Sequence, residues 1–135
     1  MKAAVFREVL KPLSIEDVDV STPGLHEVLV RTVAAGVCHS DVHFHQGLYP
    51  TPTPIVLGHE SAGIVEAVGS EVRYVQPGDH VITCLSVFCG HCNYCTTGRP
   101  NLCNRVDTLR RKDEPPRLSQ HGQVMYQFAN LSSYA

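Results

Sequence analysis

Hydrophobic residues along the chain fall into short runs, each closed by proline, glycine or charged side chains. Runs of this length, rich in Val, Ile and Leu, are typical of β-strands. They predict strands at residues 2–9, 13–20, 27–37, 64–68, 80–85 and 124–128. The first two flank Lys11-Pro12 and should form a hairpin. The run at 27–37 has few polar residues, so that strand should be buried on both faces.

The segments between these runs predict little helix. Ser40 or Asp41 is a suitable N-cap for one short helix, which Gly47 would end. Three prolines in YPTPTPIVLG (residues 49–58) exclude a helix or a central strand and predict an extended segment crossing the surface. Residues 104–120 are polar and contain proline, so they should form a loop. About six short strands and little helix predict a mainly β domain, barrel-like or sandwich-like.

Composition and charge narrow the class of protein. The chain has 135 residues, enough for a domain with a hydrophobic core, and a formal net charge of −2. That charge argues against a nucleic-acid partner. No apolar run approaches membrane-spanning length, and MKAAVFREVL has no long apolar h-region and no small-residue cleavage site, so a signal peptide is not expected. We therefore expect a cytoplasmic protein, whose clustered thiols more often bind metal than form disulfides.

Four of the six cysteines lie within CGHCNYCTTGRPNLC, at Cys89, Cys92, Cys95 and Cys103. Two residues between successive thiolates allow both to reach one ion, and Gly90 and Gly98 permit tight bends. Four thiolates complete a tetrahedral zinc site and leave no open position, so this zinc would be structural. The segment should then form a zinc lobe over about residues 86–104.

Other interpretations of the four cysteines are weaker. A thioredoxin-like CxxC motif has one cysteine pair at the start of a helix. Disulfides between such close cysteines would be strained. An iron–sulfur cluster also uses four thiolates, and the spacing alone allows it. His91 is a further candidate ligand in place of one cysteine.

A second group of polar residues follows two apolar runs. Cys38 begins CHSDVH directly after the predicted strand at 27–37, and His59 and Glu60 close the run at 55–58. Taken singly, a cysteine at a strand end is usually a small buried hydrophobe, and a histidine is usually hydrogen-bonded. Together they make a mixed Cys/His set with fewer than four ligands. A catalytic zinc requires such a set, because one position must stay open for substrate.

Four motifs occur in order along the chain: GVCHSDVH, VLGHESAGIVEAVG, VQPGDHVI and CGHCNYCTTGRPNLC. In this combination the chain resembles the zinc-dependent medium-chain alcohol dehydrogenases, in the first part of their GroES-like catalytic domain. The resemblance covers essentially the whole of residues 1–135. It implies a mainly β, partly open GroES-like barrel with short helices and the cysteine-rich lobe. The Rossmann domain of these enzymes has no counterpart here, since no strand is followed by GxGxxG.

The resemblance implies two zinc sites. Cys38 and His59 would bind the catalytic zinc, with Glu60 as an alternative ligand. Asp41 would accept a hydrogen bond from the His59 imidazole and fix its tautomer. Cys84 matches no ligand of the family and should be a core residue. The structural zinc would be held by Cys89, Cys92, Cys95 and Cys103.

The same resemblance implies a proton path. Ser40 would contact the substrate hydroxyl and pass its proton to His43 at the solvent end. His39 would lie near the pyrophosphate of NAD or NADP. The implied reaction is oxidation of primary or aryl alcohols to aldehydes, by zinc-alkoxide formation and hydride transfer.

We expect activity to belong to a longer protein. The third catalytic-zinc ligand and the dinucleotide domain of the family would lie beyond residue 135, so residues 1–135 alone should be inactive. A homo-oligomer is compatible with the resemblance. The alternative hypothesis is a stand-alone zinc-binding scaffold or interaction module without enzymatic activity.

Overall fold

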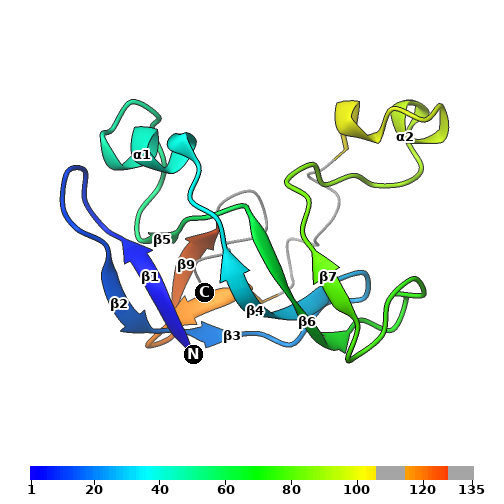
Figure 1. Ribbon diagram of the computed structural model, residues 1–135, viewed down its shortest axis with the longest axis horizontal. Coiled ribbons are helices and arrows are strands. Elements are labelled where there is room, and N and C mark those ends of the chain that lie inside the picture. Colours follow the sequence, from blue (N-terminus) through cyan, green and yellow to red (C-terminus); the bar gives the residue numbers. More distant parts are fainter. Residues whose placement is uncertain (106–114, 128–135) are drawn as a thin grey trace.

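The computed structural model describes residues 1–105 and 115–127. Two sheets and short helices make up the fold (Figure 1). The larger sheet has the order β2-β1-β5-β9-β8-β3 and the smaller one β4-β6-β7. The strands are β1 (Lys2–Phe6), β2 (Ser14–Asp17), β3 (Asp19–Val20), β4 (Val28–Ala35), β5 (Ile55–Val56), β6 (Ser61–Val68), β7 (His80–Ile82), β8 (Leu118–Gln120) and β9 (Gln123–Gln127). The helices are α1 (His39–His45), α2 (Asn93–Thr96) and the 3₁₀ helix η1 (Pro100–Leu102). The predicted mainly β architecture is confirmed.

The predicted N-terminal hairpin is present but shorter than its hydrophobic runs. β1 and β2 pair antiparallel, with Ala3 opposite Glu16. The second run divides at Val18, which is buried and whose N–H donates to the Met1 carbonyl. Beyond that point β3 leaves β1 and pairs with β8, Val20 lying opposite Leu118. Residues 118–120, predicted as loop, are therefore a strand.

Most of the hydrophobic core lies on the larger sheet, in two clusters, and Val65 of β6 is also buried. One contains Ala3, Val5, Val18, Val56, Leu118 and Met125. The other joins Phe6, Ile55 and Leu57 to Phe44 of α1. Complete burial of such a side chain contributes roughly 1.5–3 kcal/mol. Phe44 therefore fixes α1 against the sheet, and with it the residues at the start of this helix.

The proline-rich segment corrects a prediction. β5 is central in the larger sheet, antiparallel to β1 and parallel to β9. Ile55 and Val56 are almost completely buried, so the segment does not simply cross the surface. The prolines end at Pro54, so the following residues retain backbone N–H groups for pairing. Pro54 itself contributes an acceptor, because its carbonyl receives the N–H of Tyr126.

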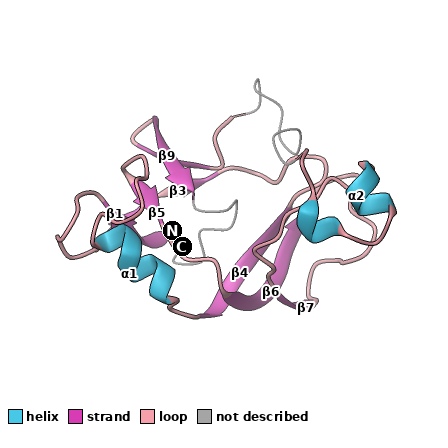
Figure 2. Ribbon diagram, turned by 90° about the horizontal axis from the view of Figure 1, so that it is seen from above, coloured by secondary structure: helices cyan, strands magenta, loops and turns pink. Residues whose placement is uncertain are grey.

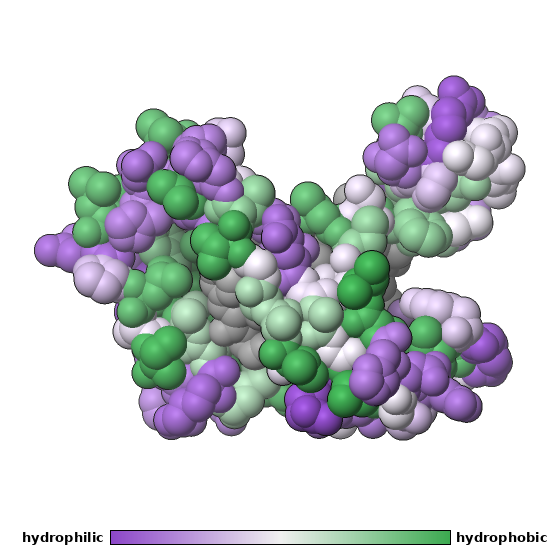
Figure 3. Space-filling model, viewed as in Figure 1, coloured by the Kyte–Doolittle hydropathy of each residue, from purple (hydrophilic) through white to green (hydrophobic). Residues whose placement is uncertain are grey.

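The strand predicted to be buried on both faces is another correction. β4 pairs with β6, and its residues are half-buried or exposed, Val33 being 65% exposed. Figure 3 shows hydrophobic side chains on this part of the surface. An apolar composition indicates that a strand favours buried surroundings. In residues 1–105 and 115–127, however, no other segment covers the exposed side chains of β4. β6 pairs in turn with β7, which ends at Ile82 and is therefore shorter than the strand predicted at 80–85.

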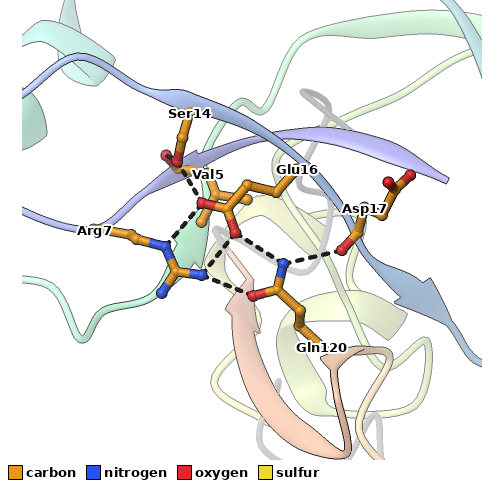
Figure 4. Close-up of polar contacts among 6 residues, drawn as sticks. All are labelled: Val5, Arg7, Ser14, Glu16, Asp17 and Gln120. Atoms are coloured by element: carbon orange, nitrogen blue, oxygen red, sulfur yellow. Dashed lines mark hydrogen bonds and ion pairs between the residues drawn. The ribbon is translucent and has the colours of Figure 1, made fainter.

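A polar cluster joins three strands of the larger sheet (Figure 4). Arg7 binds Glu16 through two hydrogen bonds, from Nε to Oε1 at 2.8 Å and from Nη2 to Oε2 at 2.7 Å. Gln120 of β8 donates to Glu16 Oε2 at 2.8 Å and to the Asp17 carbonyl at 3.0 Å. The Arg7 guanidinium holds the pKa of the Glu16 carboxyl well below its usual range.

Two sequence predictions fall partly outside the described residues. These are the loop predicted at 104–120, of which residues 106–114 are not described, and the last predicted strand, of which Phe128 is not described.

Candidate metal centres

The first centre is built where β4 passes into α1. Cys38 is the N-cap of α1, and its backbone N–H donates to Asp41 Oδ2 at 3.0 Å. The prediction that Ser40 or Asp41 would be the N-cap is therefore wrong. Asp41 is the third residue inside the helix, from which its carboxylate reaches back to the cap. The prediction that Gly47 ends the helix is confirmed, because Gln46 is the C-cap and Gly47 follows with φ +76°.

His59 and Glu60 reach Cys38 from the connection between β5 and β6. The three side chains place one ligand atom each within 4.8 Å of one another. His59 is buried and Glu60 is exposed. The Gly36 N–H donates to the Glu60 carbonyl at 3.0 Å and ties the two segments together. Sulfur, imidazole and carboxylate in this arrangement are ligands that zinc accepts.

The buried carboxylate of Asp41 lies beside the His59 ring. Asp41 Oδ1 is 3.7 Å from His59 Nδ1, and both side chains are less than a tenth exposed. This separation is longer than a hydrogen bond, so the predicted bond between them stays a prediction. His59 Nε2 faces the other way, 3.9 Å from Glu60 Oε1. One ring nitrogen is thus turned to a buried carboxylate and the other to the candidate ligands.

Gly36 is a residue of this centre that sequence reasoning missed. A Cβ at this position would lie 2.2 Å from Glu60 Oε2. Glycine is thus the residue that leaves Glu60 its place next to Cys38 and His59. The signal in the sequence was the glycine that opens GVCHSDVH, two positions before the cysteine.

The proposed relay residues follow on α1. His39 is exposed, and Ser40 and His43 are half-buried. Residues three apart on a helix share a side, so Ser40 and His43 lie on one side of α1. The rings of His39 and His43 meet edge to face, with centroids 4.7 Å apart. The roles assigned to these side chains stay predictions.

An open pocket adjoins the first centre. It is lined by His59, Glu60, Ser61 and residues 82–85, and its volume is about 690 Å³. Cys84 belongs to this lining and is exposed, so the expectation that it is a core residue is wrong. The chain leaves β7 at Ile82, and Cys84 has no strand partner to cover it. Apolar side chains beside a Cys/His set are suited to an uncharged organic ligand.

The second centre is the four-cysteine lobe, which contains α2 and η1. The sulfur of Cys92 is 3.5 Å from that of Cys95 and 3.9 Å from that of Cys103, and the Cys89 and Cys95 sulfurs are 4.0 Å apart. A tetrahedron with Zn–S bonds of about 2.3 Å has edges of about 3.8 Å. A disulfide requires about 2.05 Å. The sulfurs therefore surround a space of the size of one metal ion. This space is too small for a cluster of several iron atoms.

Backbone N–H groups point at these sulfurs. Cys92 N–H donates to Cys89 Sγ at 3.3 Å, and Cys89 N–H donates to Cys103 Sγ at 3.4 Å. The backbone N–H of Cys95 lowers the pKa of the Cys92 thiol to about 6, whereas desolvation raises the pKa of Cys95 to about 11. A divalent cation bound among these closely spaced thiols would displace their protons and convert them to thiolates.

The rest of the lobe agrees with the predicted bends. Gly90 and Gly98 both have φ +79°, a conformation that glycine adopts without strain. The His91 ring contacts the carbonyl of Cys89 through Nδ1 at 2.8 Å.

In residues 1–105 and 115–127, no helix has both the length and the apolar composition needed to cross a bilayer.

Comparison with known proteins identifies the family. The model of the alcohol dehydrogenase GroES-like domain matches residues 24–124. The chain therefore belongs to this family, and the predicted resemblance is confirmed.

Two curated relatives illustrate the similarity. S-(hydroxymethyl)glutathione dehydrogenase of Candida maltosa is 41% identical over 99% of this chain and 36% of its own length. Alcohol dehydrogenase class-3 of Drosophila melanogaster is 42% identical over 99% of the chain and 37% of its own length. The chain thus spans little more than a third of these relatives.

Solved structures agree on the fold. An alcohol dehydrogenase zinc-binding domain protein from Burkholderia ambifaria superimposes with a TM-score of 0.87 at 40% identity, over 98% of this chain and 37% of that one. Benzyl alcohol dehydrogenase from Acinetobacter calcoaceticus gives a TM-score of 0.77 at 35% identity, over 94% and 35%. The predicted GroES-like fold is confirmed.

Proposed function

We propose that this chain is the zinc-binding part of a cytoplasmic NAD(P)-dependent alcohol dehydrogenase that oxidises primary or aryl alcohols to aldehydes. One observation carries the proposal: Cys38, His59 and Glu60 converge within 4.8 Å beside an open, partly apolar pocket. A mixed set of this kind leaves a coordination position for a substrate oxygen. The relatives named for S-(hydroxymethyl)glutathione and benzyl alcohol support a primary or aryl substrate.

Each residue of the first centre would have a different role. Cys38 and His59 would hold a zinc ion, and Glu60 would be an alternative ligand. Zinc bound there supplies a Lewis acid that lowers the pKa of an alcohol hydroxyl toward neutrality. Asp41 would orient His59 from behind and keep its ligating nitrogen unprotonated. Its burial next to the ring, at 3.7 Å, supports that role.

Ser40 and His43 would remove the proton. The Ser40 hydroxyl accepts it from the alcohol and passes it to His43, which releases it to solvent. NAD(P), when bound, would supply the two-electron acceptor: it would take a hydride from the carbon that bears the hydroxyl, while the proton comes from the hydroxyl oxygen. His39 would contact the pyrophosphate of that cofactor. The further zinc ligand and the dinucleotide domain would come from the portion of the relatives that this chain does not span.

The four-cysteine lobe would hold a second, structural zinc. The sulfur separations of 3.5–4.0 Å support a single tetrahedral ion. With four thiolates bound, such an ion has no position for substrate. A scaffold or interaction module would also account for this lobe. It would not account for a cysteine, a histidine and a carboxylate gathered at a pocket elsewhere in the fold.

The test uses the complete protein that contains this chain. Reduction of NAD and of NADP is followed with benzyl alcohol, a linear primary alcohol and a secondary alcohol, and zinc is measured per chain. We expect alcohol-dependent reduction of one cofactor, highest with the first two alcohols, and about two zinc ions per chain. Zinc in the lobe alone, with neither cofactor reduced by any of the alcohols, would support the scaffold instead.

A further inference from the structure

Four aromatic rings form a row along α1, next to the proposed relay. Phe44 and Tyr49 meet at a centroid distance of 5.5 Å and an angle of 71°. Tyr49 and His43 meet at 5.0 Å and 77°. His43 and His39 meet at 4.7 Å and 77°. Each contact has the edge-to-face geometry that aromatic quadrupoles favour. Tyr49 thus stands between a core residue and the end of the proposed relay.

The row is anchored at one end in the core. Phe44 is only 9% exposed and packs against Phe6, Ile55 and Leu57. Its position is therefore fixed by close packing, and the Tyr49 ring has a rigid surface behind it. Tyr49 itself is 47% exposed. A ring this exposed contributes little core burial, which leaves its contact with His43 to be explained.

The turn after α1 brings Tyr49 back over the helix. The N–H of Leu48 donates to the His43 carbonyl at 2.9 Å, and Gly47 turns the chain with φ +76°. A Cβ on Gly47 would lie 2.9 Å from Val9 Cγ1, so no other residue fits this turn as it stands. The reversal places Tyr49 against the ring of His43, six residues earlier in the sequence.

We propose that Tyr49 is a positioning residue for His43. Its ring and the ring of His39 both contact the imidazole edge to face, at centroid distances of 5.0 and 4.7 Å, so rotation of the His43 side chain is restricted. A proton acceptor held in one orientation needs less reorganisation before it receives a proton. This inference rests on the proposed function, because it assigns His43 to the relay from Ser40. It requires the ring of Tyr49 and makes no use of the phenol hydroxyl.

Kinetics of the complete protein test the proposal. Tyr49→Ala should lower kcat for alcohol oxidation about tenfold, a part of the typical contribution of acid–base catalysis. Tyr49→Phe keeps the ring and should stay within about twofold of wild type. Tyr126→Ala is the matched control, because Tyr126 is 46% exposed and lies on β9. It should leave kcat unchanged.

Two comparisons separate positioning from substrate contact. In a His43→Gln background, Tyr49→Ala should cause no further loss, because there is no imidazole left to orient. The loss should also be the same for a small primary alcohol and for benzyl alcohol. An undiminished loss in the His43→Gln background, or a loss confined to KM of one alcohol, would overturn the positioning role.

A spectroscopic measurement distinguishes this proposal from the proposed function. With ¹³C-labelled histidine, the ring protons of His43 should show a ring-current shift from Tyr49 that persists in Tyr49→Phe and is lost in Tyr49→Ala, while the contribution of the His39 ring remains. Those shifts do not depend on turnover, so they are expected even if no alcohol is oxidised. Failure of the kinetic assay with intact shifts would refute the dehydrogenase proposal, whereas His43 shifts unaffected by Tyr49→Ala would refute the positioning role.

Discussion

The two candidate metal centres of this chain are assembled in different ways. The lobe takes its four sulfurs from one stretch of 15 residues, with one-turn helices between them. Its helix α2 lies at the opposite end of the molecule from α1 in both ribbon views (Figures 1 and 2). The other centre takes Cys38 from the end of β4 and His59 from beyond β5, 21 positions later. The first is therefore local in the sequence, and the second exists only in the folded domain.

This difference corresponds to a difference in chemistry. The lobe has four half-buried thiols and little apolar packing of its own, so a bound ion would supply much of its stability. The Cys38 centre rests on a core that is already packed, since Phe44 and Leu57 hold its two segments. The stability of this part of the fold therefore does not require a complete set of metal ligands at the Cys38 centre. Substitutions in the two centres should separate activity from stability.

The largest effect is expected at Cys38. Cys38→Ala should lower alcohol oxidation on the order of a thousandfold, since a catalytic zinc contributes several kcal/mol to the transition state. Zinc content should fall by one ion, and the thermal unfolding midpoint should stay close to wild type. Steady-state kinetics, metal analysis and thermal melts of the complete protein measure these. A large drop in the unfolding midpoint would show that this centre is structural as well.

Cys95→Ala should have the opposite profile. Removing one thiolate from a closed site should lower the free energy of unfolding by about 3 kcal/mol. Loss of activity should then follow unfolding. Urea denaturation with activity measured in parallel tests the order of events. Cys84→Ala is the matched control for stability, because Cys84 is exposed and belongs to neither ligand group, so the free energy of unfolding should not change. Activity lost at full stability would make the lobe part of the active site.

Asp41→Asn should have an intermediate effect. The amide oxygen can still accept the Cys38 N–H, but the negative charge 3.7 Å from His59 Nδ1 is lost. Outer carboxylates of this kind typically contribute 10–100-fold to metal affinity or activity, so a loss of roughly that size is expected. Competition with a zinc chelator measures the affinity. Unchanged zinc affinity and unchanged kcat would show that Asp41 acts only as a helix cap.

The smallest effect is expected far from both centres, at Glu16. Its pKa is lowered in the folded state by Arg7, so its contribution to stability is present above the unfolded pKa of roughly 4.3 and is lost as the pH falls below it. Glu16→Gln should therefore cost about 0.5–1 kcal/mol at pH 7 and almost nothing in strong acid. Denaturation curves at several pH values test this, and zinc content should not change.

Local features of the fold were predictable to the extent that neighbouring residues decide them. The hairpin of β1 and β2, the end of α1 at Gly47 and the bends at Gly90 and Gly98 follow from turn chemistry. The cap of α1 was not found, because cysteine is an unusual N-cap and the carboxylate of Asp41 acts from inside the helix. Burial was the least predictable property, as β4 and β5 were each assigned the wrong surroundings.

The sequence by itself determined the identity of the family. It also predicted that the four cysteines of the lobe lie together, because short spacings limit how far apart those sulfurs can be. It also named Cys38 and His59 through motifs. Only the tertiary structure decided that these two meet, because β4 and the β5–β6 connection are brought together by long-range strand pairing and by Phe44 in the core. The same packing set the exposure of Cys84 and the space that Gly36 leaves for Glu60. Each of these depends on residues distant in the chain, whose approach no local pattern encodes.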